Sequence, residues 1–156
     1  MTNKYLTFIS RIKEELKEID KLIIRALNAW DHARKTSDEL YFDSVALSLH
    51  GIYSGIEKIF EIIAKNIDSS IPSGDSWHLE LLKQMATEIQ QVRPPVIKKQ
   101  TFELLNEYRG FRHIVRNVYT YNISVKKLTP LVEDLQNTYA SVKKDLDEFL
   151  KIIDEI

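Results

Sequence analysis

The segment DSVALSLHGIYSGIEKIFEIIAKNID, residues 43–68, contains the strongest structural signal in the chain. Its large apolar residues recur at steps of three and four, which is the period of an α-helix with one buried face. Gly51 and Gly55 interrupt this pattern four residues apart. Because glycine lowers helix propensity, the pair indicates that another helix approaches closely here. We therefore expect a buried helix over residues 39–67.

The two ends of the chain show the same period. Apolar residues follow one another in steps of four and three from Tyr5 to Trp30, and again from Leu128 to Ile156. Such seams are typical of long helices that pack nearly parallel or antiparallel in a bundle. The first seam predicts a helix over residues 3–35.

Loop-forming residues divide the rest of the chain. The loop DSSIPSGDS precedes an expected short helix over residues 77–90, for which Ser76 is a suitable N-cap. Arg93-Pro94-Pro95 breaks the chain again, and a further helix is expected over residues 96–121. Near the C-terminal seam, Thr129-Pro130 has the pattern of an N-cap followed by proline at the first helical position, so the last helix is expected to begin there.

These elements predict an all-α fold, an up-and-down helical bundle of four long helices plus one short helix. There is no strand pattern, internal repeat or interdomain linker, so we expect a single domain over residues 1–156. A chain of this length can bury a core without disulfides or metal. The sequence has no cysteine, which excludes disulfides, thiolate metal sites and cysteine nucleophiles.

No targeting or membrane segment is predicted. The N-terminus lacks the uninterrupted apolar core of a signal peptide, and no apolar run approaches the roughly 18 residues of a membrane span. We therefore expect a cytoplasmic location and no membrane partner.

Familiar catalytic motifs are also missing, including glycine-rich phosphate loops and paired metal-binding histidines. The four histidines are scattered one per expected helix, so we expect no metal site and no cofactor. Within an apolar helix face, His50 is interpreted as a hydrogen-bonded core residue.

Charge is unevenly distributed along the chain. Residues 93–127 contain eight basic and two acidic residues and so carry a net charge of +6, whereas the whole chain carries −1. A basic surface on an acidic body is one way to bind a phosphate-bearing partner. The alternative is a solvated basic face that pairs with acidic helices nearby.

The segment RGFRHIVRNVYTY, residues 109–121, lies within this basic region. Residues three, four and seven apart share a helix face, which places Arg109, Arg112, Arg116 and Tyr119 in one stripe with His113 and Asn117 beside it. Arginine holds phosphates through paired hydrogen bonds, histidine moves protons near neutral pH, and tyrosine can stack on a base. The stripe predicts an RNA or nucleotide phosphate site, with an Arg/Glu network inside the bundle as the alternative.

The segment FRHIVRNVYTY resembles the signature of HEPN proteins, and more narrowly that of HepT-like toxins encoded beside minimal nucleotidyltransferases. The family motif is an arginine, usually followed by a polar residue, and then, after a short spacer, a histidine, one further residue and a tyrosine. Arg112, His113 and Tyr119 match the arginine, the polar residue and the tyrosine. The segments DSVALSLHGIYSGIEKIFEIIAKNID and SWHLELLKQM also resemble the second and third helices of this group.

The resemblance implies a metal-independent endoribonuclease in which the histidine and arginine promote attack of an RNA 2′-hydroxyl on the adjacent phosphate. Asn117 stands where the family has its histidine, and asparagine cannot act as a base at neutral pH. Losing a general base typically lowers the rate by about 10²–10⁴-fold. His113, one turn earlier, is either a substitute base or a structural polar residue. Arg112, Asn117 and His113 are thus the candidate catalytic residues, and Arg109 and Arg116 the candidate phosphate-binding residues.

The resemblance also implies partners. HepT-like toxins form homodimers in which two copies of the motif helix face each other across an RNA-binding cleft. Their partner is a minimal nucleotidyltransferase antitoxin, which attaches AMP to the motif tyrosine, here Tyr119. A rival interpretation is a non-catalytic module that docks a nucleotidyltransferase and presents its substrate.

Overall fold

The computed structural model describes residues 3–117 and 123–155. This part of the chain folds into six α-helices and one π-helical turn, without a strand. The helices are α1 (Asn3–Thr36), α2 (Glu39–Ile63), α3 (Trp77–Met85), α4 (Lys99–Asn117), α5 (Val125–Glu133) and α6 (Leu135–Asp154). The predicted all-α bundle is therefore confirmed, with one more short helix than expected.

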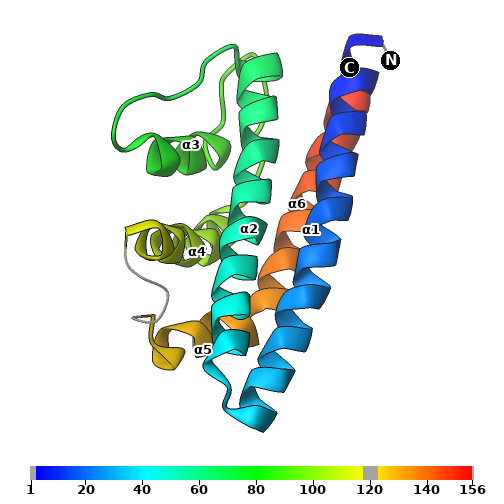
Figure 1. The fold of residues 1–156 in the computed structure, drawn as a ribbon. Helices are drawn as coiled ribbons and strands as arrows, with labels where there is room; N and C mark the ends of the chain where they lie inside the picture. Colours follow the sequence, from blue (N-terminus) through cyan, green and yellow to red (C-terminus); the bar gives the residue numbers. More distant parts are fainter. Residues whose placement is uncertain (1–2, 118–122, 156) are drawn as a thin grey trace.

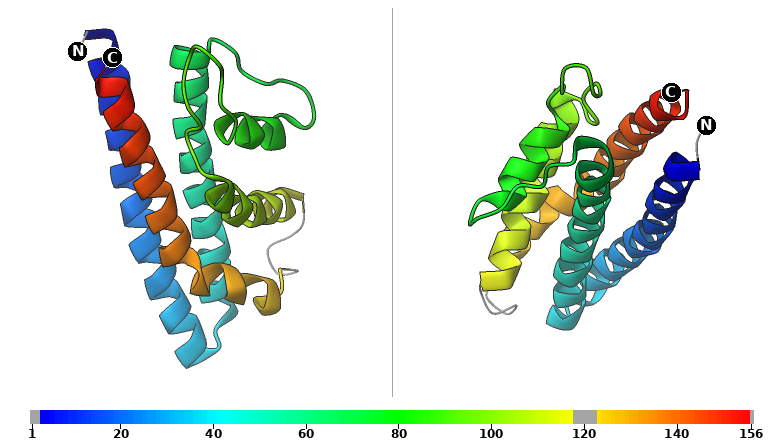
Figure 2. Two further views of the ribbon diagram at one scale, coloured as in Figure 1. Left: turned by 180° about the vertical axis from the view of Figure 1, so that it is seen from behind. Right: turned by 90° about the horizontal axis from the view of Figure 1, so that it is seen from above.

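The long helices α1, α2 and α6 run along the molecule, whereas α3 and α4 lie across α2 (Figure 1). The up-and-down order thus applies to α1, α2 and α6, whereas the fourth long helix, α4, lies across α2. The first turn of α1 and the last turn of α6 lie at the same end of the bundle, where the two helices are side by side (Figure 2). None of the described helices is long and apolar enough to span a membrane.

The two glycines of α2 have the predicted role. A Cβ atom built on Gly55 would lie 2.8 Å from Cγ1 of Ile19, and one built on Gly51 would lie 3.1 Å from Cδ1 of Leu22. Both neighbours belong to α1. The missing side chains therefore let the backbones of α1 and α2 approach closely. At its C-terminal end, α2 continues directly into the π-helical turn at residues 64–68.

The end of α3 and the start of α4, which flank the Arg93-Pro94-Pro95 loop, differ from the prediction. The backbone N–H groups of Val96 and Ile97 donate to the carbonyl oxygen of Met85, at 2.8 and 3.2 Å. These bonds tie the loop to the end of α3 instead of extending either helix. As a result α3 ends at Met85 and not at Gln90, and α4 begins at Lys99 and not at Val96.

The expected start of the last helix at Thr129-Pro130 is wrong. Ser124 is the N-cap of α5, and its side chain accepts a backbone N–H. Pro130 lies inside α5, and the hydroxyl of Thr129 donates to the carbonyl oxygen of Val125 at 2.8 Å. The helix is interrupted at Asp134, after which α6 continues the seam. The apolar seam itself is confirmed, because its described members from Leu128 onwards are buried.

Candidate functional site

Helix α4 positions the residues of the predicted stripe. Thr101, Leu105, Tyr108 and Phe111 are buried, and Val115 packs partly against the same core. These residues fix one side of the helix to the bundle. The arginines, the histidine and the asparagine predicted from the sequence all fall on the remaining surface, where they are half-buried or exposed.

The three arginines of the stripe are free of carboxylates in the described part of the chain. Half-buried Arg112 donates its Nε hydrogen to Oγ of Ser54, at 3.1 Å. Arg109 donates from Nε to Oδ1 of Asn106 at 2.8 Å, and Arg116 is exposed. No described carboxylate lies within 4.0 Å of these guanidinium groups. The arginines thus retain donors for an anion.

Helix α2 contributes two residues that face this stripe. His50 and Ser54 are one turn apart on α2, and Ser54 is the residue that contacts Arg112. His50 is half-buried; burial lowers its pKa below the ordinary value of 6.5, and the positive charges of Arg112 and Arg116 lower it further. The imidazole therefore stays neutral beside two cations. His50 was predicted as a core residue, and it instead lies at the boundary between α2 and α4.

Sequence reasoning missed Ser54 and the role of His50. The available signal was that His50 and Ser54 are both polar and are spaced i, i+4 on the expected buried helix. That spacing shows that the two share a face. It does not show which helix they face, because the crossing of α4 over α2 depends on long-range packing.

His113 and Asn117 form a separate pair at the exposed end of α4. The side-chain amide of Asn117 donates to the carbonyl oxygen of His113 at 2.7 Å, and its nitrogen lies 3.4 Å from Nδ1 of the same residue. The side chain of Asn117 thus folds back onto the backbone near the end of its own helix. The candidate catalytic residues are therefore divided: Arg112 is beside α2, and the other two contact each other in solvent.

Two basic residues of the segment 93–127 already lie next to carboxylates, so fewer of its charges are available to a ligand than its net charge indicates. The side chain of Arg93 is fully buried and holds Asp68 through Nε and NH2, at 2.6 and 2.7 Å. Lys98 lies 3.3 Å from Glu148. These two residues of the predicted basic surface already have acidic neighbours, so the remaining described basic residues of the segment lie on α4 and at the start of α5.

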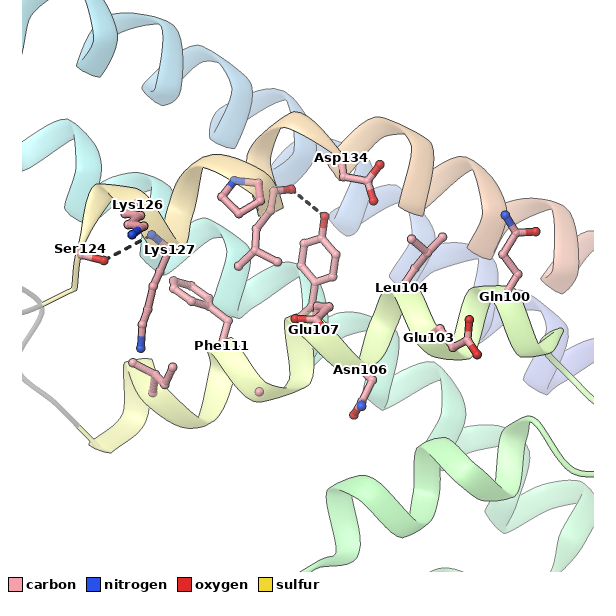
Figure 3. A pocket seen from close by; sticks show the side chains of 15 residues that line it. Gln100, Glu103, Leu104, Asn106, Glu107, Phe111, Ser124, Lys126, Lys127 and Asp134 are labelled. Atoms are coloured by element: carbon pink, nitrogen blue, oxygen red, sulfur yellow. Dashed lines mark hydrogen bonds between the residues drawn. The ribbon is translucent and has the colours of Figure 1, made fainter.

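A groove of about 970 Å³ lies between α4 and α5 (Figure 3). Its wall is apolar, with Leu104 and Phe111 among the lining residues. The hydroxyl of Tyr108 donates to the carbonyl oxygen of Leu131 at 2.6 Å and joins the two helices, and burial raises the pKa of Tyr108 to about 12. Figure 3 shows lysines at one end of the groove and Glu103 near the other.

The charges along this groove have no opposite partner in the described residues. Neither Lys126 nor Lys127 lies within 4.0 Å of a described carboxylate, and the same holds for Glu103 and Glu107 towards cations. Gly110 lies on the same surface, and a Cβ atom there would meet nothing within 4 Å. Packing within the described chain therefore gives no reason for a glycine in the middle of α4.

Tyr119, the predicted modification site, lies outside the described residues, which resume at position 123. The structure therefore leaves the prediction about this tyrosine untested.

Comparison with known proteins adds one match. A family model described as HepT-like protein matches residues 44–153, which is well over half of the chain. The matched region contains His50 and Ser54 of α2 together with the whole of α4. No curated protein and no solved structure matches the chain significantly.

Proposed function

Because the chain belongs to the HepT-like protein family, within the HEPN superfamily, we propose that it is the toxin-type half of a two-gene toxin–antitoxin module. In this proposal it acts in the cytoplasm as a metal-independent endoribonuclease. The observation that supports this activity most is the α2–α4 cluster, in which a neutral imidazole lies in the field of two guanidinium groups without carboxylate partners. RNA is the substrate class that such a cluster suits.

The proposed reaction assigns one task to each group. Arg112 and Arg116 hold the phosphate and stabilise the charge that develops on its oxygens. His50 accepts the proton of the ribose 2′-hydroxyl as the bond between O2′ and phosphorus forms. The bond from phosphorus to the 5′-oxygen breaks and that oxygen takes a proton from water, while His50 returns its proton to the hydroxide that is left. The products are a 2′,3′-cyclic phosphate and a 5′-hydroxyl.

A second function, that of a non-catalytic module, is favoured by Asn117. The side chain at the motif-histidine position donates to a carbonyl of its own helix, which is a structural use. A protein with this change could still bind RNA or a nucleotidyltransferase through Arg112 and Arg116. It would present a bound segment to its partner without cleaving it.

The proposed partners are a second copy of the chain and a minimal nucleotidyltransferase antitoxin, which would modify Tyr119 with AMP. The α4–α5 groove supports the homodimer. In a two-fold interface each surface meets its own copy, so acidic and basic ends of one groove can pair with the opposite ends of the other. Glu103 and Glu107 would meet Lys126 and Lys127 of the second copy, and Gly110 would allow the two α4 helices to approach.

A nuclease assay separates the two functions. Mixed RNA is incubated with the protein in EDTA, and the ends of any products are analysed. The endoribonuclease is supported by 2′,3′-cyclic phosphate ends that disappear in Arg112→Ala and His50→Ala and persist in His113→Ala, the matched control. Loss of cleavage in His113→Ala together with full cleavage by His50→Ala would show that the general base is His113 on α4 and not His50. If wild type is inactive and Asn117→His cleaves, the chain is a degenerate enzyme and the binding module is correct.

A further inference from the structure

A second groove, of about 480 Å³, is lined by residues of α1, α2, α3 and α4. Arg112 contributes to its wall, so this groove adjoins the α2–α4 cluster. Its volume lies in the range of small-molecule sites and is sufficient for one nucleotide. Two further lining residues, Trp77 and Glu61, provide an aromatic ring and a carboxylate.

Glu61 is the one carboxylate of this groove without an ion pair or a side-chain hydrogen bond in the described part of the chain. Glu15 pairs with Lys58 at 3.2 Å and Glu18 with Lys21 at 3.2 Å, and Glu57 contacts Nδ1 of His78 at 2.7 Å. Burial raises the pKa of Glu61, and the nearby charge of Glu57 raises it further. Half-buried Glu61 therefore has acceptor oxygens that ion pairs leave unused.

Trp77 presents a fixed aromatic ring. Its indole packs against the imidazole of His78, with ring centroids 3.7 Å apart. Nδ1 of His78 in turn lies 2.7 Å from a carboxylate oxygen of buried Glu57. This chain of contacts anchors one side of the indole, and the same residue lines the groove. Unstacked RNA bases commonly bind by stacking on such a ring.

We propose that this groove binds a guanine nucleotide of an RNA strand, with the base against Trp77, its Watson–Crick edge on Glu61 and its phosphate on Arg112. The inference rests on the proposed function and names the base that the site selects. Guanine is the base that presents two adjacent donors, N1–H and N2–H, to the two oxygens of one carboxylate. Adenine and cytosine offer one amino group beside an acceptor nitrogen, and uracil offers one N–H between two carbonyls.

Tryptophan fluorescence tests the proposal. The chain has two tryptophans, and Trp30 is buried in the core, so a ligand in the groove changes the emission of Trp77. The full-length protein is titrated with GMP, AMP, CMP and UMP, and with guanosine. We expect saturable quenching with GMP favoured roughly tenfold over the other nucleotides, which is the discrimination that a bidentate base contact provides. Trp77→Phe should abolish the signal.

Three variants assign the contacts. Glu61→Gln replaces one acceptor with a donor and should abolish the preference for GMP, whereas Glu18→Gln, on the same groove but paired with Lys21, should keep it. Arg112→Ala should weaken GMP roughly tenfold and leave guanosine unchanged, because guanosine has no phosphate. Circular dichroism confirms that each variant is folded.

Equal binding of the four nucleotides, no saturable quenching, or a preference unaffected by Glu61→Gln would overturn the proposal. These results are separable from the function proposed above. RNA binding that requires Arg112 but shows no guanine preference contradicts this inference alone. Selective GMP binding by a protein that binds no RNA contradicts the proposed function and the RNA part of this inference, and it leaves a site for a free guanine nucleotide.

Discussion

Arg93 and Arg112 belong to the same basic segment of the sequence and have opposite environments. The guanidinium group of Arg93 is enclosed with Asp68 and also donates to backbone carbonyls, including that of Gln84 at 3.1 Å. Among the described residues, Arg112 has a single hydrogen-bond partner, the neutral Ser54, and it lines a groove. A buried guanidinium that is fully bonded stabilises one fold, whereas a half-buried one with unused donors is available to a ligand.

The buried pair makes a stability prediction. Arg93→Ala removes the partner of Asp68 and leaves a buried charge uncompensated, so we expect the free energy of unfolding to fall by about 3–5 kcal/mol. Urea denaturation at neutral pH measures it. Lys98→Ala, which removes an exposed lysine near Glu148, is the control and should cost at most about 1 kcal/mol. A loss below that of the control would show that the pair contributes little.

His50 makes a pH prediction. Its folded-state pKa is lowered by burial and by Arg112 and Arg116, the charged groups of α4 whose fields reach it. The unfolded chain therefore binds more protons than the folded chain just below pH 6.5. The stability that this group contributes is complete above pH 6.5 and falls as the pH drops through the folded pKa. The difference in unfolding free energy between wild type and His50→Gln, measured from pH 8 to pH 5, should follow this course; a difference independent of pH would contradict it.

At the scale of elements, the contact of α1 with α2 is set by absent side chains. Alanine normally favours a helix over glycine by up to about 1 kcal/mol. At Gly55 the added methyl would lie 2.8 Å from the branched Ile19, within α1, and the packing cost should exceed that gain.

We therefore expect Gly55→Ala to lower the free energy of unfolding by about 1–3 kcal/mol, as measured by thermal or urea denaturation. Gly51→Ala is the matched comparison, because its new methyl meets the mobile end of Leu22 at 3.1 Å and should cost less. Equal stability of Gly55→Ala and wild type would mean that the two helices can separate at no cost.

The sequence predicts the interiors of these helices better than their ends. Periodicity reports burial, and the described bounds of α1 agree within one residue with the helix predicted over residues 3–35. The ends depend on which group takes the last backbone hydrogen bonds. The carbonyl oxygen of Met85 accepts from the backbone N–H of Val96 in the loop. Ser124 caps α5 five residues before Thr129-Pro130, where the sequence pattern placed the helix start. Neither choice is encoded in local composition.

At the scale of the whole molecule, the site needs two helices that are far apart in sequence. The pattern within α4 predicted that Arg112 and Arg116 lie away from the buried side of the helix, and the structure places them there, half-buried and exposed; their role in binding phosphate stays a prediction. The contribution of His50 arises only when α4 crosses α2, and periodicity within one helix cannot predict a crossing. Likewise the α4–α5 groove lies between two helices that the bond from Tyr108 to the carbonyl of Leu131 joins, and periodicity within one helix does not predict that contact.

The α4–α5 groove leads to a prediction about the oligomeric state. Sedimentation at micromolar concentration should show a wild-type dimer. Lys126→Glu combined with Lys127→Glu should give a monomer, because acidic ends then face each other, and Glu103→Lys combined with Glu107→Lys should do the same. An equimolar mixture of the two double variants should recover a dimer. A wild-type monomer, or dimers unaffected by either charge reversal, would exclude this interface.

RNA affinity as a function of salt tests the central claim, that the α2–α4 cluster binds RNA phosphate, most directly. The measurement uses fluorescence anisotropy of a labelled single strand between about 50 and 200 mM salt. We predict a steep loss of affinity with salt for wild type, and weaker binding with a shallower slope for Arg112→Ala and Arg116→Ala. Lys98→Ala, whose lysine already has an acidic neighbour, should behave as wild type. Affinity that is independent of salt, or that neither arginine variant changes, would contradict the account.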